Sequence, residues 1–263
     1  MPELPEVETL VRELSPRLDG ARIFRLELSH PEVLEKGEAG ELRGRPILSV
    51  ARRGKYICLS LDRGELLTVH LRMTGRLSFD LPEVMEKHLR ATFSLAGGAK
   101  LYFFDVRKFG RLHLWPEAGA LEEKLGPEPL AARTVLASLN RCQSRRAIKA
   151  VLLDQIVLAG IGNIYADEAL FASGIRPERS LAELGAGRMR RLAEAIPKVL
   201  EEAIADSGTT LSDYRRVSGE EGRHREKLKV YGRAGKPCGQ CGTVIQKTSV
   251  AQRGTHYCPH CQR

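Results

Sequence analysis

The first residues of the chain are of types that can do covalent chemistry. Aminopeptidases readily remove an initiator methionine before a small residue, so the mature chain would begin with the secondary amine of Pro2. An α-amino group has a pKa of ~7.7–8.0, against about 10.4 for lysine, so much of it is uncharged and nucleophilic at neutral pH. Its attack on a carbonyl-like carbon would form a cationic Schiff base, which acts as an electron sink. Glu3 and Glu6 lie beside it in the sequence and are suited to delivering and removing protons.

The same residues also suit the first turn of a helix, and this plainer interpretation stays open on local grounds. Leu4, Val7, Val11 and Leu14 recur at helical spacing. We therefore expect a helix immediately after the N-terminus, whether or not its first residues are catalytic.

Four of the six cysteines form two C-x2-C pairs separated by 16 residues. Each pair can offer two thiolates from a tight turn, and the gap fits a β-hairpin that brings the pairs together. This is the spacing of a structural four-cysteine zinc site, so we expect one structural zinc ion. So short a module would draw most of its folding free energy from the metal. Cys58 and Cys142 are interpreted as ordinary thiols. The four expected ligands are Cys238, Cys241, Cys258 and Cys261.

The segment between the cysteine pairs predicts a β-ribbon. Residues 244–250 and 255–257 have the composition of strands, and Gln252, Arg253 and Gly254 are expected to form the turn. An arginine at the tip of a rigid ribbon is well placed to bind a phosphate. A solvated turn arginine is the alternative when the ribbon is considered by itself.

Charge is distributed unevenly along the chain. The net charge is +9, yet residues 211–263 alone hold 11 Lys and Arg against 4 Asp and Glu. So concentrated a positive balance favours a polyanionic partner such as nucleic acid, and a solvated basic tail is the alternative that charge alone leaves open. No apolar run approaches the ~18 residues that a membrane span needs, and no leader-like segment precedes residue 20. We therefore expect a soluble, cytoplasmic protein with no membrane partner.

The elements that must position these residues fall into a β-rich part and a helical part. Short apolar or alternating runs separated by turn signals predict a β-sandwich within residues 1–125. Residues 126–129 have the composition of a linker. The expected strands span residues 47–50, 56–61, 66–71, 89–95 and 101–105.

From about residue 131 the pattern becomes helical. We expect a helix capped by Ser144 that runs to Ile156, a second helix over residues 164–173 that Gly174 ends, and a third over residues 181–206. Between the first two, the segment 160–163 contains two glycines, whose backbone amides can approach a phosphate near a helix N-terminus.

Three separated motifs, taken with the cysteine spacing, resemble one known family along nearly the whole chain. Residues 2–9 (PELPEVET), 125–130 (LGPEPL) and 160–166 (GIGNIYA), followed by the segment 230–261, resemble bacterial formamidopyrimidine-DNA glycosylases in the same order. The resemblance implies an α+β multidomain fold. Its parts would be an N-terminal β-sandwich with an N-terminal helix (1–125), a helix-two-turns-helix domain (131–220) and a C-terminal zinc ribbon (229–263).

The resemblance also implies an activity and a set of site residues. The expected activity is removal of oxidised purines such as 8-oxoguanine and formamidopyrimidines from damaged double-stranded DNA, followed by β,δ-elimination at the abasic site. We expect a monomer that acts at the bacterial nucleoid. By position in the family motifs, the catalytic residues would be Pro2, Glu3, Lys55 and Arg253. The DNA-contact residues would be His70, His88, Lys108, Arg145, Asn163 and Tyr231. The gap left by the extruded base would be filled by Met73, Arg107 and Phe109.

The chain departs from the family pattern at three places that bear on specificity. Arg72 stands where glycine is common, and Lys108 replaces an arginine, which keeps the charge but loses bidentate geometry. The segment Gly222–Arg225 lacks the aromatic residues that many relatives carry near the damaged base. Two alternatives therefore stay open: the same chemistry with a preference for oxidised pyrimidines, and a non-catalytic protein that binds damaged DNA.

Overall fold

The computed structural model describes residues 1–263, which divide into two units. Unit 1 comprises Met1–Glu123 and Asp206–Arg223, and unit 2 comprises Lys124–Ala205 and His224–Arg263. Each unit therefore contains two separate stretches of the chain. None of the helices combines the length and apolar composition of a membrane span.

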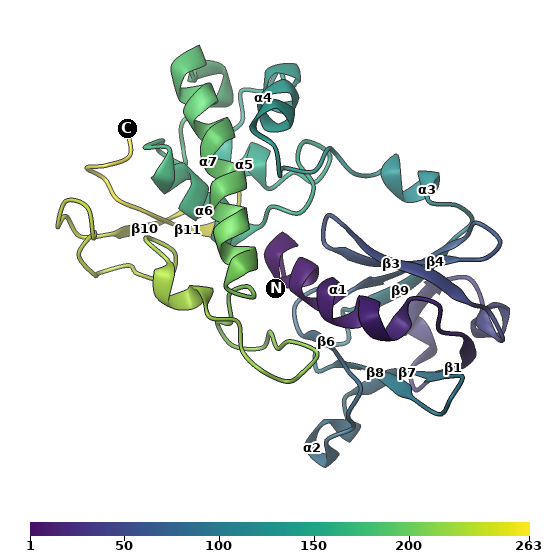
Figure 1. The fold of residues 1–263 in the computed structure, drawn as a ribbon. Coiled ribbons are helices and arrows are strands. Elements are labelled where there is room, and N and C mark those ends of the chain that lie inside the picture. Colours follow the sequence, from purple (N-terminus) through teal and green to yellow (C-terminus); the bar gives the residue numbers. More distant parts are fainter. The chain divides into compact units, whose positions relative to one another are not determined.

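Unit 1 begins with the helix that the sequence predicts. Helix α1 spans Leu4–Leu18, and its leucines and valines are buried. It packs on strands β3 (Ile47–Arg53) and β4 (Tyr56–Leu61), and Figure 1 draws it beside them. Its start is fixed by a capping box in which Glu3 is the N-cap and the carboxylate of Glu6 accepts the Glu3 N–H at 2.8 Å. The residue before the cap, Pro2, is consequently attached to a rigid helix end.

The rest of residues 1–123 forms the predicted β-sandwich of two sheets. One sheet has the strand order β2-β9-β5-β4-β3 and the other β1-β7-β8-β6, and every pairing except β2 with β9 is antiparallel. The strands are β1 (Ile23–Leu28), β2 (Leu34–Lys36), β3 (Ile47–Arg53), β4 (Tyr56–Leu61), β5 (Leu66–His70), β6 (Gly75–Ser78), β7 (Leu89–Leu95), β8 (Lys100–Asp105) and β9 (Arg111–Trp115). Short helical turns connect some of them: η1 (Pro31–Val33), η2 (Ala39–Leu42), α2 (Glu83–Glu86) and α3 (Gly119–Glu122).

The sequence pattern predicted β4 and β7 to the residue but missed β1, β2, β6 and β9. Three of the missed strands lie at sheet edges, where few side chains need to be apolar. In β1 only Ile23 and Leu26 are buried, whereas all five residues of the central β5 are. β1 therefore lacks the apolar run on which sequence assignment depends.

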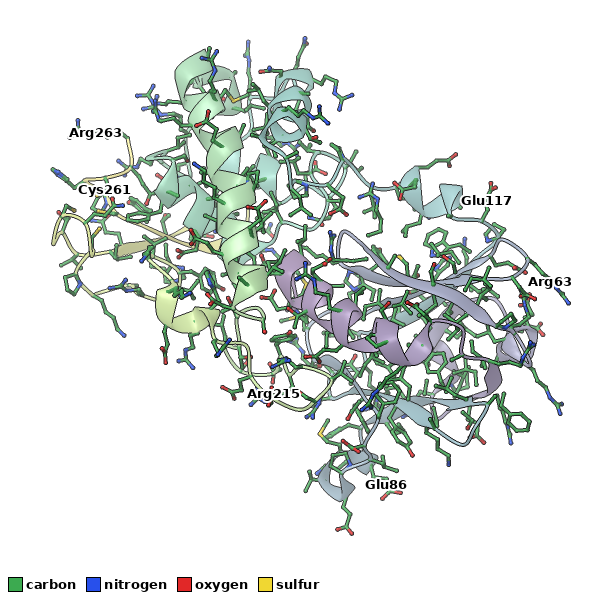
Figure 2. All side chains as sticks on the ribbon, viewed as in Figure 1. Arg63, Glu86, Glu117, Arg215, Cys261 and Arg263 are labelled. Carbon is green, nitrogen blue, oxygen red and sulfur yellow. The ribbon has the colours of Figure 1, made fainter.

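The second stretch of unit 1, residues 206–223, packs against α1. The Thr209 N–H donates to Glu6 Oε1 at 2.7 Å, and the Val217 N–H donates to a Glu13 carboxylate oxygen at 2.8 Å. Tyr214 and Val217 join the core of the sandwich. Figure 2 shows the side chain of Arg215 in this loop. The carboxylate of Glu6 thus joins the start of α1 to this segment.

Unit 2 contains helices at the three predicted places, with different bounds, and two further helical elements that the sequence pattern did not predict. In chain order, the helical elements are α4 (Ala132–Arg141), α5 (Ile148–Leu152), α6 (Asn163–Ala172), the 3₁₀ turn η3 (Leu181–Glu183), α7 (Ala186–Ala205) and the 3₁₀ turn η4 (His224–Lys227). The two that were not predicted are α4 and η4. Gly174 ends α6 with a φ of 69°, which glycine adopts readily.

The long helix expected from Ser144 to Ile156 is wrong. The N-cap of α5 is Ala147, and Ile156 is 74% exposed rather than buried. After Leu152 the Asp154 carboxylate accepts the Ile156 N–H at 3.1 Å, which stabilises a turn in place of a further helical turn. The third helix is also shorter than expected, because residues 181–183 form only a 3₁₀ turn before α7 begins at Ala186.

The C-terminal ribbon of unit 2 pairs β10 (Gln246–Val250) with β11 (Arg253–Tyr257). The expected turn position of Arg253 is wrong, because Arg253 pairs with Val250 as the first residue of β11. The turn consists of Ala251 and Gln252, whose φ angles of 49° and 60° are those of a two-residue type I′ loop. Arg253 is therefore held by strand pairing.

Candidate active site

The N-terminal residues combine a buried carboxylate with a fixed backbone. Pro2 and Glu3 are both buried, and Glu3 is 2% exposed. The Glu6 carboxylate accepts the Glu3 N–H with one oxygen and the Thr209 N–H with the other, so Glu3 has little freedom to move. An amine on Pro2 would therefore lie next to the carboxylate residue Glu3, whose backbone is held in place.

Lys55 lies in the hairpin loop between β3 and β4. Arg53 pairs with Tyr56, so the loop has only two residues, Gly54 and Lys55. Gly54 has a φ of 55°, which a two-residue loop of type II′ requires at its first position. The Lys55 side chain is buried, although most lysines are exposed. A tight loop thus fixes the base of this side chain.

His70, at the end of β5, is a neutral imidazole. Burial lowers its pKa to about 3, with smaller contributions from the positive charges of Arg72 and Lys55. Its Nδ1 accepts the Arg72 N–H at 3.1 Å, so the proton of the neutral ring is on Nε2. The Tyr56 ring packs edge-on against it at 4.6 Å between centroids. His70 can therefore offer a phosphate a neutral N–H donor.

The structure brings the three expected gap-filling residues together. The Arg107 guanidinium donates to Met73 Sδ at 3.2 Å and lies over the Phe109 ring, 4.9 Å from its centroid. Met73 is 41% exposed and Phe109 47% exposed, so neither is a core residue. An exposed cluster of a thioether, a guanidinium and a phenyl ring has the chemistry needed to stack against bases.

Left-handed backbone conformations occur next to this cluster. Arg72 has a φ of 53° and Lys108 a φ of 60°, which side-chain-bearing residues rarely adopt. Glycine is the residue that adopts such a conformation without strain. His88 is half-buried, and its carbonyl oxygen accepts the Asp105 N–H at 2.9 Å.

In unit 2 a buried network fixes the residue after Arg253. Lys149 Nζ donates to the Gly254 carbonyl at 3.0 Å and to Thr255 Oγ1 at 2.8 Å, and Asn163 Nδ2 donates to the same carbonyl at 2.9 Å. Lys149 is fully buried, and its charge is paired with Asp167 at 2.7 Å. These contacts connect α5 and α6 to the ribbon strand that carries Arg253.

Asp167 also binds the ribbon directly. Its Oδ2 accepts the His256 N–H at 2.8 Å, and the His256 ring packs edge-on against Tyr231 at 4.9 Å. Asn163 Nδ2 lies 3.5 Å from the Tyr231 hydroxyl. The structure thus brings Asn163, Tyr231 and the start of β11 together, whereas Arg145 is exposed in the segment before α5.

Sequence reasoning missed the network that holds this site. Lys149 has the sequence context of one of several basic residues at a helix start, yet it is buried and paired with a residue 18 positions later. A short-range sequence pattern cannot predict this pair, because no residue of opposite charge lies three or four positions from either Lys149 or Asp167.

Cys58 is as expected: burial raises the pKa of its thiol to about 12, which makes it unreactive.

The four ribbon cysteines form a zinc site. Their sulfur atoms all lie within 4.8 Å of one another, and two of the separations are 3.5 Å and 3.9 Å. A tetrahedral site with Zn–S bonds of ~2.3 Å has sulfur–sulfur edges of about 3.8 Å. Hydrogen bonds from Thr243 lower the pKa of the Cys241 thiol to about 6, whereas burial raises the pKa of the Cys258 and Cys261 thiols. Zinc binding requires thiolates and therefore releases the protons of these cysteines.

The zinc module packs on a helix of unit 2. Phe171 of α6 shares a small apolar core with Val230, Ile245 and the buried ligands Cys238 and Cys258. Gln262 Nε2 donates to the Ile175 carbonyl at 2.9 Å, which holds the C-terminal loop in which Figure 2 labels Cys261. The expectation of one structural zinc ion fits this closed shell of four thiols.

Comparison with known proteins identifies the class and then the family. Residues 1–112 match the N-terminal domain of formamidopyrimidine-DNA glycosylase, residues 125–215 its H2TH domain, and residues 235–263 the zinc finger found in FPG and IleRS. The fold and the cysteine site thus define a zinc-finger DNA glycosylase. The chain belongs to the formamidopyrimidine-DNA glycosylase family.

Individual relatives support this assignment over the whole chain. The formamidopyrimidine-DNA glycosylase of Chloroflexus aurantiacus is 46% identical and covers 100% of this chain and 98% of its own length. The crystal structure of MutM (Fpg) from Thermus thermophilus matches with a TM-score of 0.89 at 41% identity, covering 99% and 98% of the two chains. A Lactococcus lactis Fpg bound to DNA containing an abasic site matches with a TM-score of 0.87 at 36% identity, covering 99% of each chain.

Proposed function

We propose that this chain excises oxidised purines by covalent catalysis from Pro2 and then cleaves the DNA strand at the abasic site. The chain is a base-excision repair DNA glycosylase that acts on damaged double-stranded DNA. The observation that carries the residue-level proposal is the rigid N-terminus, where Pro2 precedes a buried Glu3 whose backbone is held by Glu6. Such immobility suits a nucleophile that must meet one carbon atom.

The proposed reaction starts after removal of Met1. The Pro2 nitrogen bonds to C1′ of the extruded nucleotide while the bond from C1′ to the base breaks, and the base leaves with its electron pair and a proton. Glu3 serves these proton transfers and protonates the sugar oxygen as the ring opens to the cationic imine.

Strand cleavage follows from the acidity that the imine confers. Loss of the C2′ proton expels the 3′ phosphate, and a second elimination expels the 5′ phosphate. Hydrolysis of the imine then restores the Pro2 amine. Every bonding change is a substitution, an elimination or a hydrolysis, and none is a net oxidation or reduction. The reaction therefore needs protein acids and bases and no redox cofactor.

Cationic and neutral donors bind the phosphates in this proposal. Lys55 and Arg253 contact the phosphates beside the lesion, and His70 contributes a neutral N–H donor. The remaining proposed contacts to the DNA backbone come from His88, Lys108, Arg145, Asn163 and Tyr231. Met73, Arg107 and Phe109 fill the space of the extruded nucleotide, which recovers part of the few kcal/mol that extrusion costs.

Purine specificity is supported by the relatives rather than by a single contact. The full-length relatives carry the name formamidopyrimidine-DNA glycosylase, and two Lactococcus lactis Fpg structures hold DNA containing Fapy-dG. These findings do not favour the oxidised-pyrimidine alternative or the non-catalytic one. We place the enzyme at the bacterial nucleoid in the cytoplasm, where its substrate is found.

A panel of lesions tests this function. Duplexes carrying 8-oxoguanine, a formamidopyrimidine or thymine glycol are incubated with the enzyme, and released bases and strand ends are analysed by mass spectrometry. We expect the two purine lesions to be released fastest, with a phosphate left on both sides of the gap. Preferred release of thymine glycol would establish the pyrimidine alternative, and binding without any base release would establish a non-catalytic protein. An undamaged duplex of the same sequence is the control.

A further inference from the structure

Asp105 is a fully buried carboxylate at the end of β8, immediately before the loop that carries Arg107 and Phe109. One of its oxygens accepts the Thr74 hydroxyl proton and also the Arg107 N–H at 3.1 Å. The other accepts the Gly110 N–H at 2.6 Å. The carboxylate therefore binds both ends of the loop 106–110 and the loop that contains Met73.

The contacts of Asp105 form a closed arrangement. The Thr74 hydroxyl, which donates to Asp105, also accepts the Arg107 N–H at 3.1 Å, so the two loops are bonded to each other as well as to the carboxylate. A Cβ at Gly110 would lie 2.5 Å from the Phe103 ring and 3.1 Å from Asp105 Oδ2. Glycine is therefore required for the loop to return this close to the carboxylate.

The backbone of Asp105 extends the arrangement to a further proposed DNA contact. The Asp105 N–H donates to the His88 carbonyl at 2.9 Å, and Arg90 Nε donates to the Asp105 carbonyl at 2.8 Å. Burying a carboxylate is costly unless hydrogen bonds satisfy it. An apolar side chain at this position would avoid the free-energy cost of burying a carboxylate. The presence of Asp105 therefore indicates a role other than packing.

We propose that Asp105 is the positioning residue that holds Met73, Arg107 and Phe109 as one preorganised wedge for the gap left by the extruded nucleotide. The proposal rests on the proposed function, because it assigns Asp105 a role in filling that gap. Without the carboxylate the two loops would have to be ordered at the moment of DNA binding, at a cost in conformational entropy. With the Asp105 carboxylate in place, the two loops are already ordered when the protein has folded.

The test variant is Asp105→Asn, which keeps the shape of the side chain. Whichever way the amide is oriented, its NH2 group replaces an acceptor and faces an existing donor. Thr74→Val removes only the hydroxyl that joins the loops, and Thr74→Ser restores it. Leu101→Ala, at a buried position on the same strand, controls for general weakening of the sheet.

The first measurement follows the wedge itself. A duplex contains a tetrahydrofuran abasic analogue with 2-aminopurine opposite it, and fluorescence is recorded at saturating protein. We expect insertion of the wild-type wedge to change the 2-aminopurine signal, and Asp105→Asn and Thr74→Val to lose most of that change even when fully bound. Thr74→Ser and Leu101→Ala should keep it. Equal signal changes for Asp105→Asn and the wild type would overturn the proposal.

The second measurement separates gap filling from the chemistry at the sugar. For Asp105→Asn, single-turnover release of 8-oxoguanine from duplex DNA should fall on the order of 10-fold or more. Borohydride trapping on a single-stranded abasic oligonucleotide, which has no opposite strand and no gap, should keep the wild-type rate. A parallel loss in both assays would show that Asp105 acts only through general structure. If the wild type itself gave no adduct on the abasic oligonucleotide, the proposed function would fail as well.

Discussion

Arg72 and Lys108 have left-handed backbones directly beside the side chains that we propose to enter the DNA. A side-chain-bearing residue in this conformation costs roughly 1–2 kcal/mol. Such strain persists at positions where the surrounding contacts determine the conformation. Here the contacts are those that present Met73 and Phe109 to solvent. The departure from glycine at position 72 is therefore a cost in stability.

Replacing Arg72 with glycine should stabilise unit 1. Relief of roughly 1–2 kcal/mol of strain is partly offset by about 0.4–1 kcal/mol of added chain entropy in the unfolded state, so we expect a net gain of up to about 1.6 kcal/mol. Urea denaturation followed by Trp115, the single tryptophan, measures it. Arg63→Gly, at an exposed turn position without positive φ, is the matched control and should destabilise. Equal losses for both variants would contradict the strain argument.

The neutral state of His70 predicts a pH dependence of stability. Its pKa is about 3 in the folded chain and about 6.5 when unfolded, so only the unfolded state binds the proton between these values. The stability from this group is complete above pH ~6.5 and falls by about 1.4 kcal/mol for each pH unit below it. Between pH 7 and pH 5, His70→Gln should lose less stability than the wild type in urea denaturation. Parallel pH profiles would show that His70 is protonated in the fold.

Single residues were predictable from sequence only where a motif carries them. Met73, Arg107 and Phe109 were assigned as a set by the family order, and the structure brings them together. Asp105 gave no such signal, because an acidic residue at the last position of a strand resembles the start of any turn. Its importance follows from the hydrogen bonds of two loops 30 residues apart, which only the fold reveals.

At the scale of elements, the ribbon depends on helices that lie far from it in the sequence. β11 is held by Lys149 on α5 and by Asn163 and Asp167 on α6. The strand itself gives Arg253 a defined direction through its pairing with Val250. Arg253, which we propose binds a phosphate, is thus part of a structure that includes both the hairpin and the helices α5 and α6.

Lys149→Met should test this dependence. Removing one partner of a buried ion pair leaves Asp167 unpaired and typically costs 3–5 kcal/mol, so we expect about that loss in the stability of unit 2. The double variant Lys149→Met/Asp167→Asn should recover part of it. Affinity for abasic DNA, measured by fluorescence anisotropy, should fall in the single variant while one zinc ion stays bound. Unchanged affinity in a folded single variant would show that the buried ion pair does not position Arg253.

Zinc removal should affect the same element by another route. The apolar core of the ribbon is small, and most of its folding free energy comes from the metal. Chelation or Cys238→Ser should therefore disorder Arg253 and weaken DNA binding, as measured by anisotropy at fixed salt. Cys142→Ser, at a cysteine outside the zinc shell, should leave both zinc content and affinity unchanged. Full affinity in metal-free protein would refute the structural role.

Elements were predictable where burial leaves a clear pattern. β4 is mostly apolar and β7 alternates apolar and polar residues, and both strands were placed correctly, as was α1 with its helical spacing. The helix after Ser144 was overextended, because Ile156 fits the apolar spacing while the Asp154 side chain ends the helix through a local hydrogen bond. The apolar periodicity therefore could not predict where the helix ends, because it carries no information about side chains that bind backbone N–H groups.

At the scale of the whole molecule, two stretches of chain contribute to each unit. The segment 206–223 follows the longest helix of unit 2, yet it packs on α1 and supplies the N–H that fixes Glu6. The position of this segment directly after α7 in the sequence did not predict its packing on α1. The β-sandwich and the zinc site could be predicted because they follow from local patterns and spacing, and the complete fold class followed from the resemblance. The support of the N-terminus comes from a residue 203 positions away, which no local pattern indicates.

The central claim is that Pro2 becomes bonded to deoxyribose during turnover. The direct test is to react the correctly processed enzyme with abasic DNA in borohydride, digest the adduct and locate the sugar by mass spectrometry. We predict a reduced sugar fragment on the N-terminal peptide at Pro2, and no adduct when an N-terminal tag blocks the amine, while a C-terminal tag is tolerated. A sugar found only on a lysine, such as Lys55, would contradict the mechanism.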